Sequence, residues 1–235
     1  MTIKRIIPDT LTCCNLLCGA AAVLMATQHE FIYALLLILA GALFDFCDGS
    51  SARLLKVPSP IGVELDSLAD DITFGLAPAM MLCCYLQPFI GWWCLVALLM
   101  AAFSAIRLAK FNLDKRQTTS FIGLATPPNA IFWASITCTP IVEMADYMPW
   151  ILLGMSIVSC YLLVSEIPFF GLKFHNLTWH DNWRTYLFLI GCVVIIVFCA
   201  VRAVQYEYTE MAAFAGCVCV LWYILYNFVL LLARR

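Results

Sequence analysis

Apolar residues run along this chain in long stretches that are separated by short polar segments. The pattern predicts helices over residues 11–27, 31–54, 64–86, 90–110, 128–145, 149–165, 184–203 and 211–232. Most of these stretches approach the ~20 residues that a helix needs to cross the hydrocarbon core of a bilayer. We therefore expect an all-α polytopic membrane protein with about eight transmembrane helices, forming a single membrane domain over residues 1–235.

Prolines mark two of the predicted helix boundaries. Pro8 is expected to set the start of the first helix, because proline lacks the N–H that a helix interior requires. Pro58 and Pro60 exclude a continuous helix through residues 55–63. The second and third helices should therefore be antiparallel neighbours that are joined by a turn.

Composition supports this picture and excludes one class of partner. Hydrophobic residues make up 64% of the chain and charged residues 12%, which is typical of a membrane protein. The formal net charge of −2 predicts no basic surface for nucleic acid. The 13 cysteines are scattered through apolar stretches without zinc-site spacing, so we interpret them as small apolar helix residues.

The distribution of Lys and Arg predicts the orientation. With the N-terminus inside, every basic residue except Arg202 falls on the cytoplasmic side of the eight predicted helices. We therefore expect a protein that is integral to the cell (inner) membrane, with both termini cytoplasmic. The polar segments around residues 45–70 then lie at the cytoplasmic mouth, and the active site should face the cytoplasm.

Four aspartates occur where apolar segments should not tolerate them. Asp45 and Asp48 close the second predicted helix, and Asp66 and Asp70 open the third. One carboxylate at mid-bilayer costs roughly 2.5–3.5 kcal/mol on insertion scales. The i, i+3 and i, i+4 spacings place each pair on one helix face. Two antiparallel helices would therefore bring four carboxylates into one small volume.

Two divalent cations would neutralise these four charges. Carboxylate oxygens favour Mg²⁺ or Mn²⁺, with Ca²⁺ as a possible occupant, and paired ions serve displacement at phosphorus. Arg53 lies on the same stripe and suits a phosphate, while Gly49 and Ala52 leave room for a nucleotide to approach the backbone. The alternative is that the acids form ion pairs with Arg53 and Lys56 that hold the helices together. Two positive charges, however, do not balance four negative ones.

The complete pattern D-x₂-D-G-x₂-A-R-x₈-G-x₃-D-x₃-D over residues 45–70 resembles the signature of the CDP-alcohol phosphatidyltransferase family. The resemblance implies transfer of a phosphatidyl group from CDP-diacylglycerol to an alcohol, with release of CMP. It also implies a homodimer, a catalytic six-helix core over residues 1–165 and two additional transmembrane helices over residues 184–232.

The resemblance also assigns roles to residues of this chain. It implies that Asp45, Asp48, Asp66 and Asp70 bind the metals, and that Asp70 is in addition the general base for the acceptor hydroxyl. It places the CDP moiety of CDP-diacylglycerol along Gly49, Ala52, Arg53 and Gly62.

Two polar residues precede this motif in the first predicted helix. Thr12 and Asn15 are spaced i, i+3 and therefore share a helix face. They contact either the cytidine of CDP-diacylglycerol or the edge of the metal site, or they form a hydrogen bond between helices.

Three later segments concern the acceptor. DSLADDITFGLAPA (66–79), RLAKFN (107–112) and FIGLATPPNA (121–130) resemble the serine-using branch of the family, the membrane-embedded phosphatidylserine synthases of bacteria and archaea. L-serine needs a cation for its carboxylate and an acceptor for its ammonium. Arg107 and Lys110 are candidates for the carboxylate or for the lipid diphosphate, or they only set orientation. Asp71 is a candidate for the ammonium or pairs with a base, and Asn129 either touches substrate or starts a helix.

Three other functions stay open from the sequence. The acceptor could be another alcohol, such as glycerol 3-phosphate or inositol phosphate. The phosphate of such an acceptor would require a pocket with more Arg and Lys residues. An intramembrane prenyltransferase also uses aspartate-bound magnesium, but lacks the Gly-x₂-Ala-Arg insert at residues 49–53. A cation transporter would use the acids as an ion path, yet the chain shows no repeated halves.

Overall fold

The computed structural model of the chain describes residues 3–57, 60–113, 121–169, 179–206 and 210–232. The described part is almost entirely helical, with a two-residue strand pair, Phe121–Ile122 (β1) and Pro168–Phe169 (β2). The helices are α1 (Ile3–Thr27), α2 (Phe31–Leu55), α3 (Pro60–Asp70), α4 (Ala77–Ile90), α5 (Leu99–Leu113), α6 (Thr126–Thr137), α7 (Met148–Val164), α8 (Trp179–Tyr206) and α9 (Glu210–Leu232).

Five helical stretches in the described part are long and apolar enough to cross a membrane. One of them, Pro60–Leu113, has 54 residues and contains two passes. The chain reverses at Gly91, whose φ of 55° and ψ of −135° suit glycine alone. A 3₁₀ helix, Gly91–Leu98, then leads into α5. With the shorter helices α6 and α7, each of the eight predicted segments overlaps a helix, and the all-α membrane prediction is confirmed.

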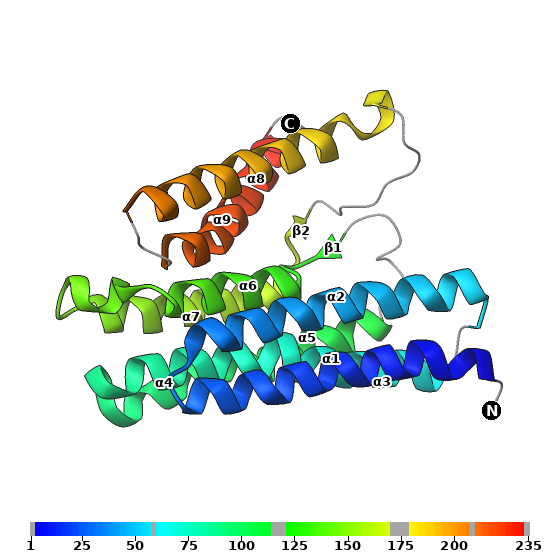
Figure 1. Ribbon diagram of the computed structural model, residues 1–235, viewed down its shortest axis with the longest axis horizontal. Helices are drawn as coiled ribbons and strands as arrows, with labels where there is room; N and C mark the ends of the chain where they lie inside the picture. Colours follow the sequence, from blue (N-terminus) through cyan, green and yellow to red (C-terminus); the bar gives the residue numbers. More distant parts are fainter. Residues whose placement is uncertain (1–2, 58–59, 114–120, 170–178, 207–209, 233–235) are drawn as a thin grey trace.

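Two layers of long helices form the bundle (Figure 1). Helices α1 to α7 lie roughly side by side, with α1 packed on α2, α3 and α4, and α6 packed on α2 and α4. Helices α8 and α9 form a pair of their own, and α9 packs on α6. The turns between α1 and α2, and between α4 and α5, lie at the left end of Figure 1, whereas the α2–α3 break lies at the right end.

The predicted break between the second and third helices is confirmed. Helix α2 ends at Leu55, and Lys56 adopts a left-handed conformation with φ 54° and ψ 45°. The N–H groups of Lys56 and Val57 bond back to carbonyls of the last turn of α2, which caps the helix. Helix α3 resumes at Pro60, because proline is tolerated in the first turn of a helix.

Two boundary predictions are wrong. Helix α1 begins at Ile3, and Pro8 lies inside it instead of setting its start. The predicted span 128–145 is not one α-helix, because α6 ends at Thr137 and a 3₁₀ turn, Pro140–Met144, follows. Pro140 cannot continue the backbone hydrogen bonding of α6, so the chain closes the span with a separate turn.

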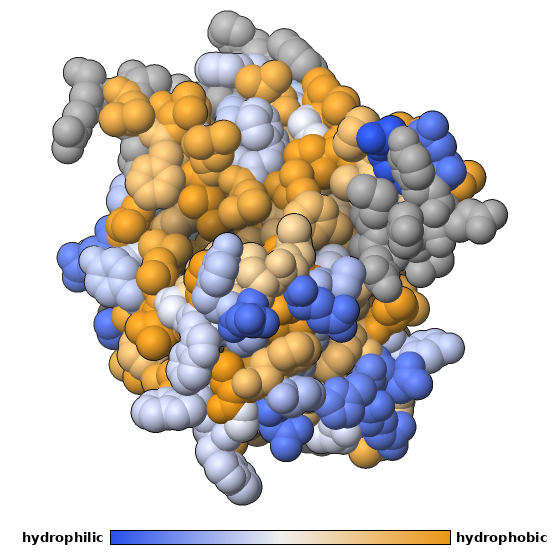
Figure 2. Space-filling view, turned by 90° about the vertical axis from the view of Figure 1, so that its left-hand side faces the viewer, coloured by the Kyte–Doolittle hydropathy of each residue, from blue (hydrophilic) through white to orange (hydrophobic). Residues whose placement is uncertain are grey.

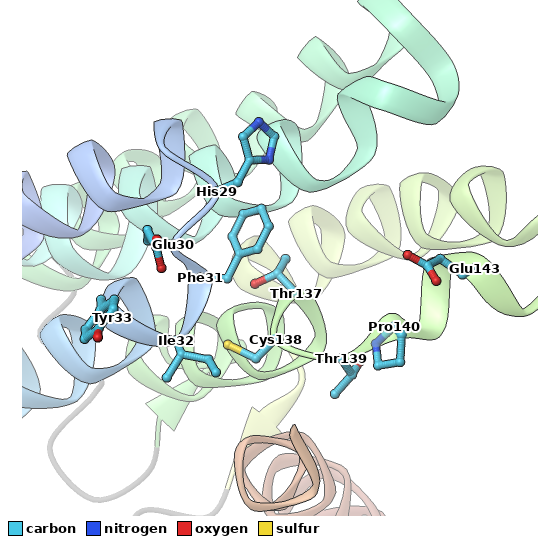
Figure 3. A pocket seen from close by; sticks show the side chains of 10 residues that line it. All are labelled: His29, Glu30, Phe31, Ile32, Tyr33, Thr137, Cys138, Thr139, Pro140 and Glu143. Carbon is cyan, nitrogen blue, oxygen red and sulfur yellow. The ribbon is translucent and has the colours of Figure 1, made fainter. Parts of the chain in front are cut away.

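The left end of the bundle carries a mixed surface, on which hydrophilic side chains interrupt the apolar ones (Figure 2). A cavity of about 460 Å³ opens here between the start of α2 and the end of α6. Its lining includes His29, Glu30, Tyr33, Thr139 and Glu143 (Figure 3). At 1.5 Å per helical residue, Glu30 and Asp45 are separated by about 20 Å along α2, so this cavity is distinct from the aspartate cluster.

Candidate active site

The two predicted aspartate stripes meet. Carboxylate oxygens of Asp45 and Asp48 on α2 and of Asp66 on α3 lie within 4.8 Å of one another. The group therefore joins α2 to α3. Asp70 lies one turn further along α3 and interacts electrostatically with the other three. The helix geometry expected from the sequence therefore does bring Asp45, Asp48 and Asp66 together, with Asp70 one turn away on α3.

Helix α1 supplies a third wall of this site. The Thr12 hydroxyl donates to Asp48 Oδ2 at 2.6 Å, and Asn15 Nδ2 donates to Asp70 Oδ1 at 3.1 Å. Both α1 side chains are buried. Thr12 and Asn15 thus reach the aspartates directly, and each fixes one carboxylate of a different helix. A contact of either residue with cytidine stays a prediction.

Close packing of three helices holds α1 in this position. A π-helix, Asp71–Leu76, follows α3, and its Thr73 donates from Oγ1 to the carbonyl of Asn15 at 2.9 Å. A Cβ at Gly19 would lie 2.7 Å from Thr73 Cα, and one at Gly41 would lie 2.6 Å from Thr73 Cγ2. Only glycine permits this approach of α1 and α2 to Thr73. Short π-helical segments are rare and often mark functional sites.

The residues present fit a divalent cation. Asp66 Oδ1 is buried and has no hydrogen-bond partner in the described part of the chain, which is costly unless something else binds it. The gathered donors are all oxygens, the ligand type that Mg²⁺, Mn²⁺ and Ca²⁺ prefer. Asp45, Asp48 and Asp66 are therefore a group that can bind a metal.

The rest of the family motif borders the cluster. Arg53 is exposed and donates from Nη2 to Ser50 Oγ at 3.2 Å. A Cβ at Gly49 would lie 3.8 Å from Arg53 Nη1, so the guanidinium lies close to the glycine. Ala52 and Gly62 are partly exposed. A surface of small residues beside an exposed guanidinium suits a nucleotide diphosphate. Binding of a nucleotide by these four residues stays a prediction.

The candidate acceptor residues have different surroundings. Arg107 is buried on α5, and its guanidinium interacts electrostatically with Asp70. Its Nη1 lies 3.5 Å from Thr126 Oγ1, and its Nε has no hydrogen-bond partner in the described part. Lys110 is exposed, one turn further along α5. Of the two bases, Arg107 is thus the buried one.

Asp71 and Asn129 lie in separate places. Asp71 faces α5, because a Cβ at Gly75 would meet both Asp71 Oδ1 and Ser104 Oγ, at 2.6 and 2.8 Å. Asn129 is buried and accepts a hydrogen bond from Ser159, to which Trp133 also donates. Asn129 therefore serves the contact between α6 and α7, and an acceptor role for it stays a prediction.

Sequence reasoning missed three residues near Arg107. Ser104 precedes Arg107 by one turn on the buried face of α5, and i, i+3 spacing was a usable signal. Thr126 lies inside the TPPN segment, next to residues that the sequence had singled out. Tyr223 on α9 lies 116 positions after Arg107 and near enough to influence it electrostatically, and no local pattern pointed to it.

Known proteins with similar sequences share one name. A protein named CDP-diacylglycerol–serine O-phosphatidyltransferase from Bacillus subtilis is 37% identical over 172 residues, which is 72% of this chain and 92% of that protein. The protein of the same name from Mycobacterium tuberculosis H37Rv is 30% identical over 217 residues, covering 87% of this chain and 72% of its own. The protein of the same name from Methanocaldococcus jannaschii is 32% identical over 132 residues, which is 55% of this chain and 60% of that protein.

The family comparison covers the part of the chain that builds the site. The CDP-alcohol phosphatidyltransferase family matches residues 5–164, which include α1 to α7 and all four aspartates. Helices α8 and α9 lie beyond the match. The aspartate cluster, its α1 supports and the matched sequence lead to the same conclusion: the chain belongs to the CDP-alcohol phosphatidyltransferase family.

Proposed function

We propose that this chain transfers the phosphatidyl group from CDP-diacylglycerol to L-serine and releases CMP. The gathering of Asp45, Asp48 and Asp66, with Asp70 one turn further along α3, carries the proposal. Relatives that bear the name of this activity cover most of the chain. The four carboxylates would hold the cations that phosphoryl transfer requires, and the buried guanidinium of Arg107 suits an acceptor that carries a carboxylate.

The site would hold its lipid substrate at the diphosphate. Asp45, Asp48 and Asp66, with Asp70, would hold two divalent cations, Mg²⁺ or Mn²⁺, with Ca²⁺ able to occupy the same oxygens. When bound, such cations neutralise the diphosphate and stabilise the charge on departing CMP. Arg53 would contact a phosphate, and Gly49, Ala52 and Gly62 would leave space for the cytidine nucleotide.

Asp70 is the proposed general base. It accepts the proton of the serine hydroxyl while the hydroxyl oxygen forms a bond to the phosphorus that bears diacylglycerol. The bond between that phosphorus and the CMP oxygen breaks, and CMP leaves. The hydrogen bond from Asn15 keeps one Asp70 oxygen oriented, so the other is available to the acceptor.

Arg107 would bind the serine carboxylate. In serine the hydroxyl oxygen and the carboxylate are separated by only three bonds, so both can reach Asp70 and Arg107 together. The unsatisfied Nε of Arg107 is a donor that such a carboxylate would use. Asp71 is the proposed partner of the serine ammonium, with Lys110 and Asn129 as outer contacts.

Orientation and assembly are further parts of the proposal. The Lys and Arg distribution favours a cytoplasmic active site and cytoplasmic termini. The bacterial relatives favour the inner membrane. The family resemblance favours a homodimer, with α1–α7 as the catalytic core and α8–α9 as additional transmembrane helices.

An acceptor panel tests the proposed function. Purified protein in detergent receives CDP-diacylglycerol, Mg²⁺ or Mn²⁺ and one labelled acceptor at a time: L-serine, glycerol 3-phosphate or inositol phosphate. We expect phosphatidylserine and CMP in equal amounts with L-serine alone. Product from a phosphorylated acceptor with none from serine would reject serine as the substrate, and release of diphosphate instead of CMP would reject the reaction.

A further inference from the structure

Two of the thirteen cysteines are in direct contact. Cys83 of α4 and Cys94 of the 3₁₀ helix Gly91–Leu98 lie on either side of the chain reversal, with their Sγ atoms 3.4 Å apart. Both are free thiols, and both belong to the same buried hydrophobic cluster. The two sulfurs of a disulfide are about 2.05 Å apart, so an approach of roughly 1.4 Å would complete a bond. The sequence interpretation of scattered small apolar residues therefore does not describe this pair.

Aromatic side chains fix both partners of the pair. Two positions after Cys83, the Tyr85 hydroxyl donates to a backbone carbonyl at 2.5 Å and accepts from a backbone N–H at 3.0 Å, both in the segment between α6 and α7. Next to Cys94, the ring of Trp93 meets that of Trp150 on α7, with centroids 6.2 Å apart. Helix α4 and the 3₁₀ helix are thus each tied to another part of the bundle, which keeps the two thiols adjacent.

The pair lies toward the end of the bundle that is opposite the aspartate cluster. The α4–α5 turn lies at the left end of Figure 1, and the α2–α3 break lies at the right end. In the proposed orientation the left end faces outward, and the outer side of a bacterial inner membrane is an oxidising compartment. Trp92, at the turn, is 85% exposed. Cys83 is 7% exposed and Cys94 2%, so an oxidant that enters at the turn reaches Cys83 first.

The 3₁₀ helix that contains Cys94 is unusually long. It has eight residues, whereas 3₁₀ helices rarely exceed three or four residues, because their hydrogen-bond geometry is poorer than that of an α-helix. A covalent link from Cys94 to α4 would therefore stabilise a segment whose own backbone hydrogen bonds are weak.

We propose that Cys83 and Cys94 are a redox-active pair that a disulfide oxidant converts into a disulfide bond, which locks the α4–α5 turn. The Cys83 thiolate attacks one sulfur of the oxidant, and the other sulfur leaves as a thiolate. The Cys94 thiolate then attacks the Cys83 sulfur and displaces the second half of the oxidant. The two cysteines are oxidised, and the oxidant is reduced to two thiols that take up the two protons.

Treatment of the purified, folded protein with dithiodipyridine tests the inference, because this small aromatic disulfide is an oxidant of the required class. The remaining thiols are then alkylated, and the protein is digested without reductant. We expect mass spectrometry to find Cys83 and Cys94 joined, with the loss of two hydrogen atoms. Closing a loop of this size should raise the unfolding temperature in detergent by roughly 5 °C, and dithiothreitol should reverse the rise.

Cys84→Ala is the matched control, because Cys84 is adjacent to Cys83 and only partly buried. This variant should form the same bond with the same rise in unfolding temperature, whereas Cys94→Ala should show neither. Recovery of Cys83 and Cys94 as thiols or as adducts of the oxidant, a bond from Cys94 to Cys84, or an unchanged unfolding temperature would each overturn the inference. No readout depends on CDP-diacylglycerol or serine, so failure of the proposed function would leave these results unchanged.

Discussion

The α1–α3 region and the α8–α9 pair both bury polar side chains, but they use them differently. In α1–α3 these side chains converge on carboxylates, as Thr12 does on Asp48 and Asn15 on Asp70. In α8–α9, Asn227 instead donates to a backbone carbonyl. The apolar stretch of α8 is also less enclosed, with 11% of its residues buried against 28% in α2.

This difference distinguishes the helices that carry the candidate site, α1–α3, from a helix pair, α8–α9, whose polar contacts are structural. Hydrogen bonds that end on acidic side chains, beside atoms left without partners, prepare α1–α3 for a ligand. Hydrogen bonds that end on the backbone only fix α8–α9 in place. Changes in the first region should therefore act on the reaction, and changes in the second should act on stability.

Metal removal should have the largest effect. Because the clustered carboxylates repel each other without a cation, a chelator such as EDTA should abolish CMP release, and Mg²⁺ or Mn²⁺ should restore it. The measurement is CMP formation before chelation, after it and after metal return. Full activity in excess chelator would contradict a catalytic metal in the α1–α3 region.

Asp70→Asn should come next. Loss of a general base typically lowers the rate by about 10²- to 10⁴-fold, and we expect such a fall in kcat with metal still bound. Glu64→Gln is the control, because Glu64 is an exposed acid on the same helix. If Asp70→Asn retained wild-type kcat, the base would have to be another residue.

Thr12→Val should have an intermediate effect. It removes the donor to Asp48 and keeps the side-chain shape, and a hydrogen bond to a charged group is worth about 1.5–3 kcal/mol. Since one tenfold step is about 1.4 kcal/mol, kcat/KM should fall roughly tenfold. The control Thr10→Val removes an exposed hydroxyl whose one hydrogen bond in the described part of the chain goes to the Ile6 carbonyl of its own helix, and it should leave kcat/KM unchanged. An equal fall in both variants would locate the effect in α1 as a whole.

Gly41→Ala should mainly affect stability. Its Cβ would lie 2.6 Å from Thr73 Cγ2, and such overpacking typically costs about 1–3 kcal/mol. The unfolding temperature in detergent should fall, and Thr73→Ser should recover part of the loss by removing Cγ2. Gly154→Ala, with open space around its position, should not be destabilising. A stable Gly41→Ala protein would contradict the close packing that positions α1.

Local patterns predicted the centre of the site. The i, i+3 and i, i+4 spacings of the aspartates fixed the faces of two helices, and Pro58 with Pro60 fixed the break between them. The helix faces and the break each depend on a few neighbouring residues, so both can be predicted from local sequence. The role of Thr12 and Asn15 was left open because periodicity gives the face of a helix but not its partner.

The remaining misses have physical causes as well. Pro8 indicated a helix start, yet α1 includes it, because a single proline near a helix end can be accommodated. The π-helix after Asp70 depends on packing of Thr73 against α1 and α2, which no local pattern records. The packing of α9 on α6 joins segments far apart in the sequence, so it too is set by tertiary structure.

The most direct test of the α1–α3 site is a titration of Mn²⁺ into the purified protein, followed by electron paramagnetic resonance. We predict that two ions bind and that their spins are coupled, since paired catalytic ions lie about 3.5–4 Å apart. Asp45→Asn and Asp66→Asn should lose the coupled signal together with CMP release. Wild-type protein that binds no Mn²⁺, or that shows the same coupled signal after both aspartates are replaced, would contradict the account.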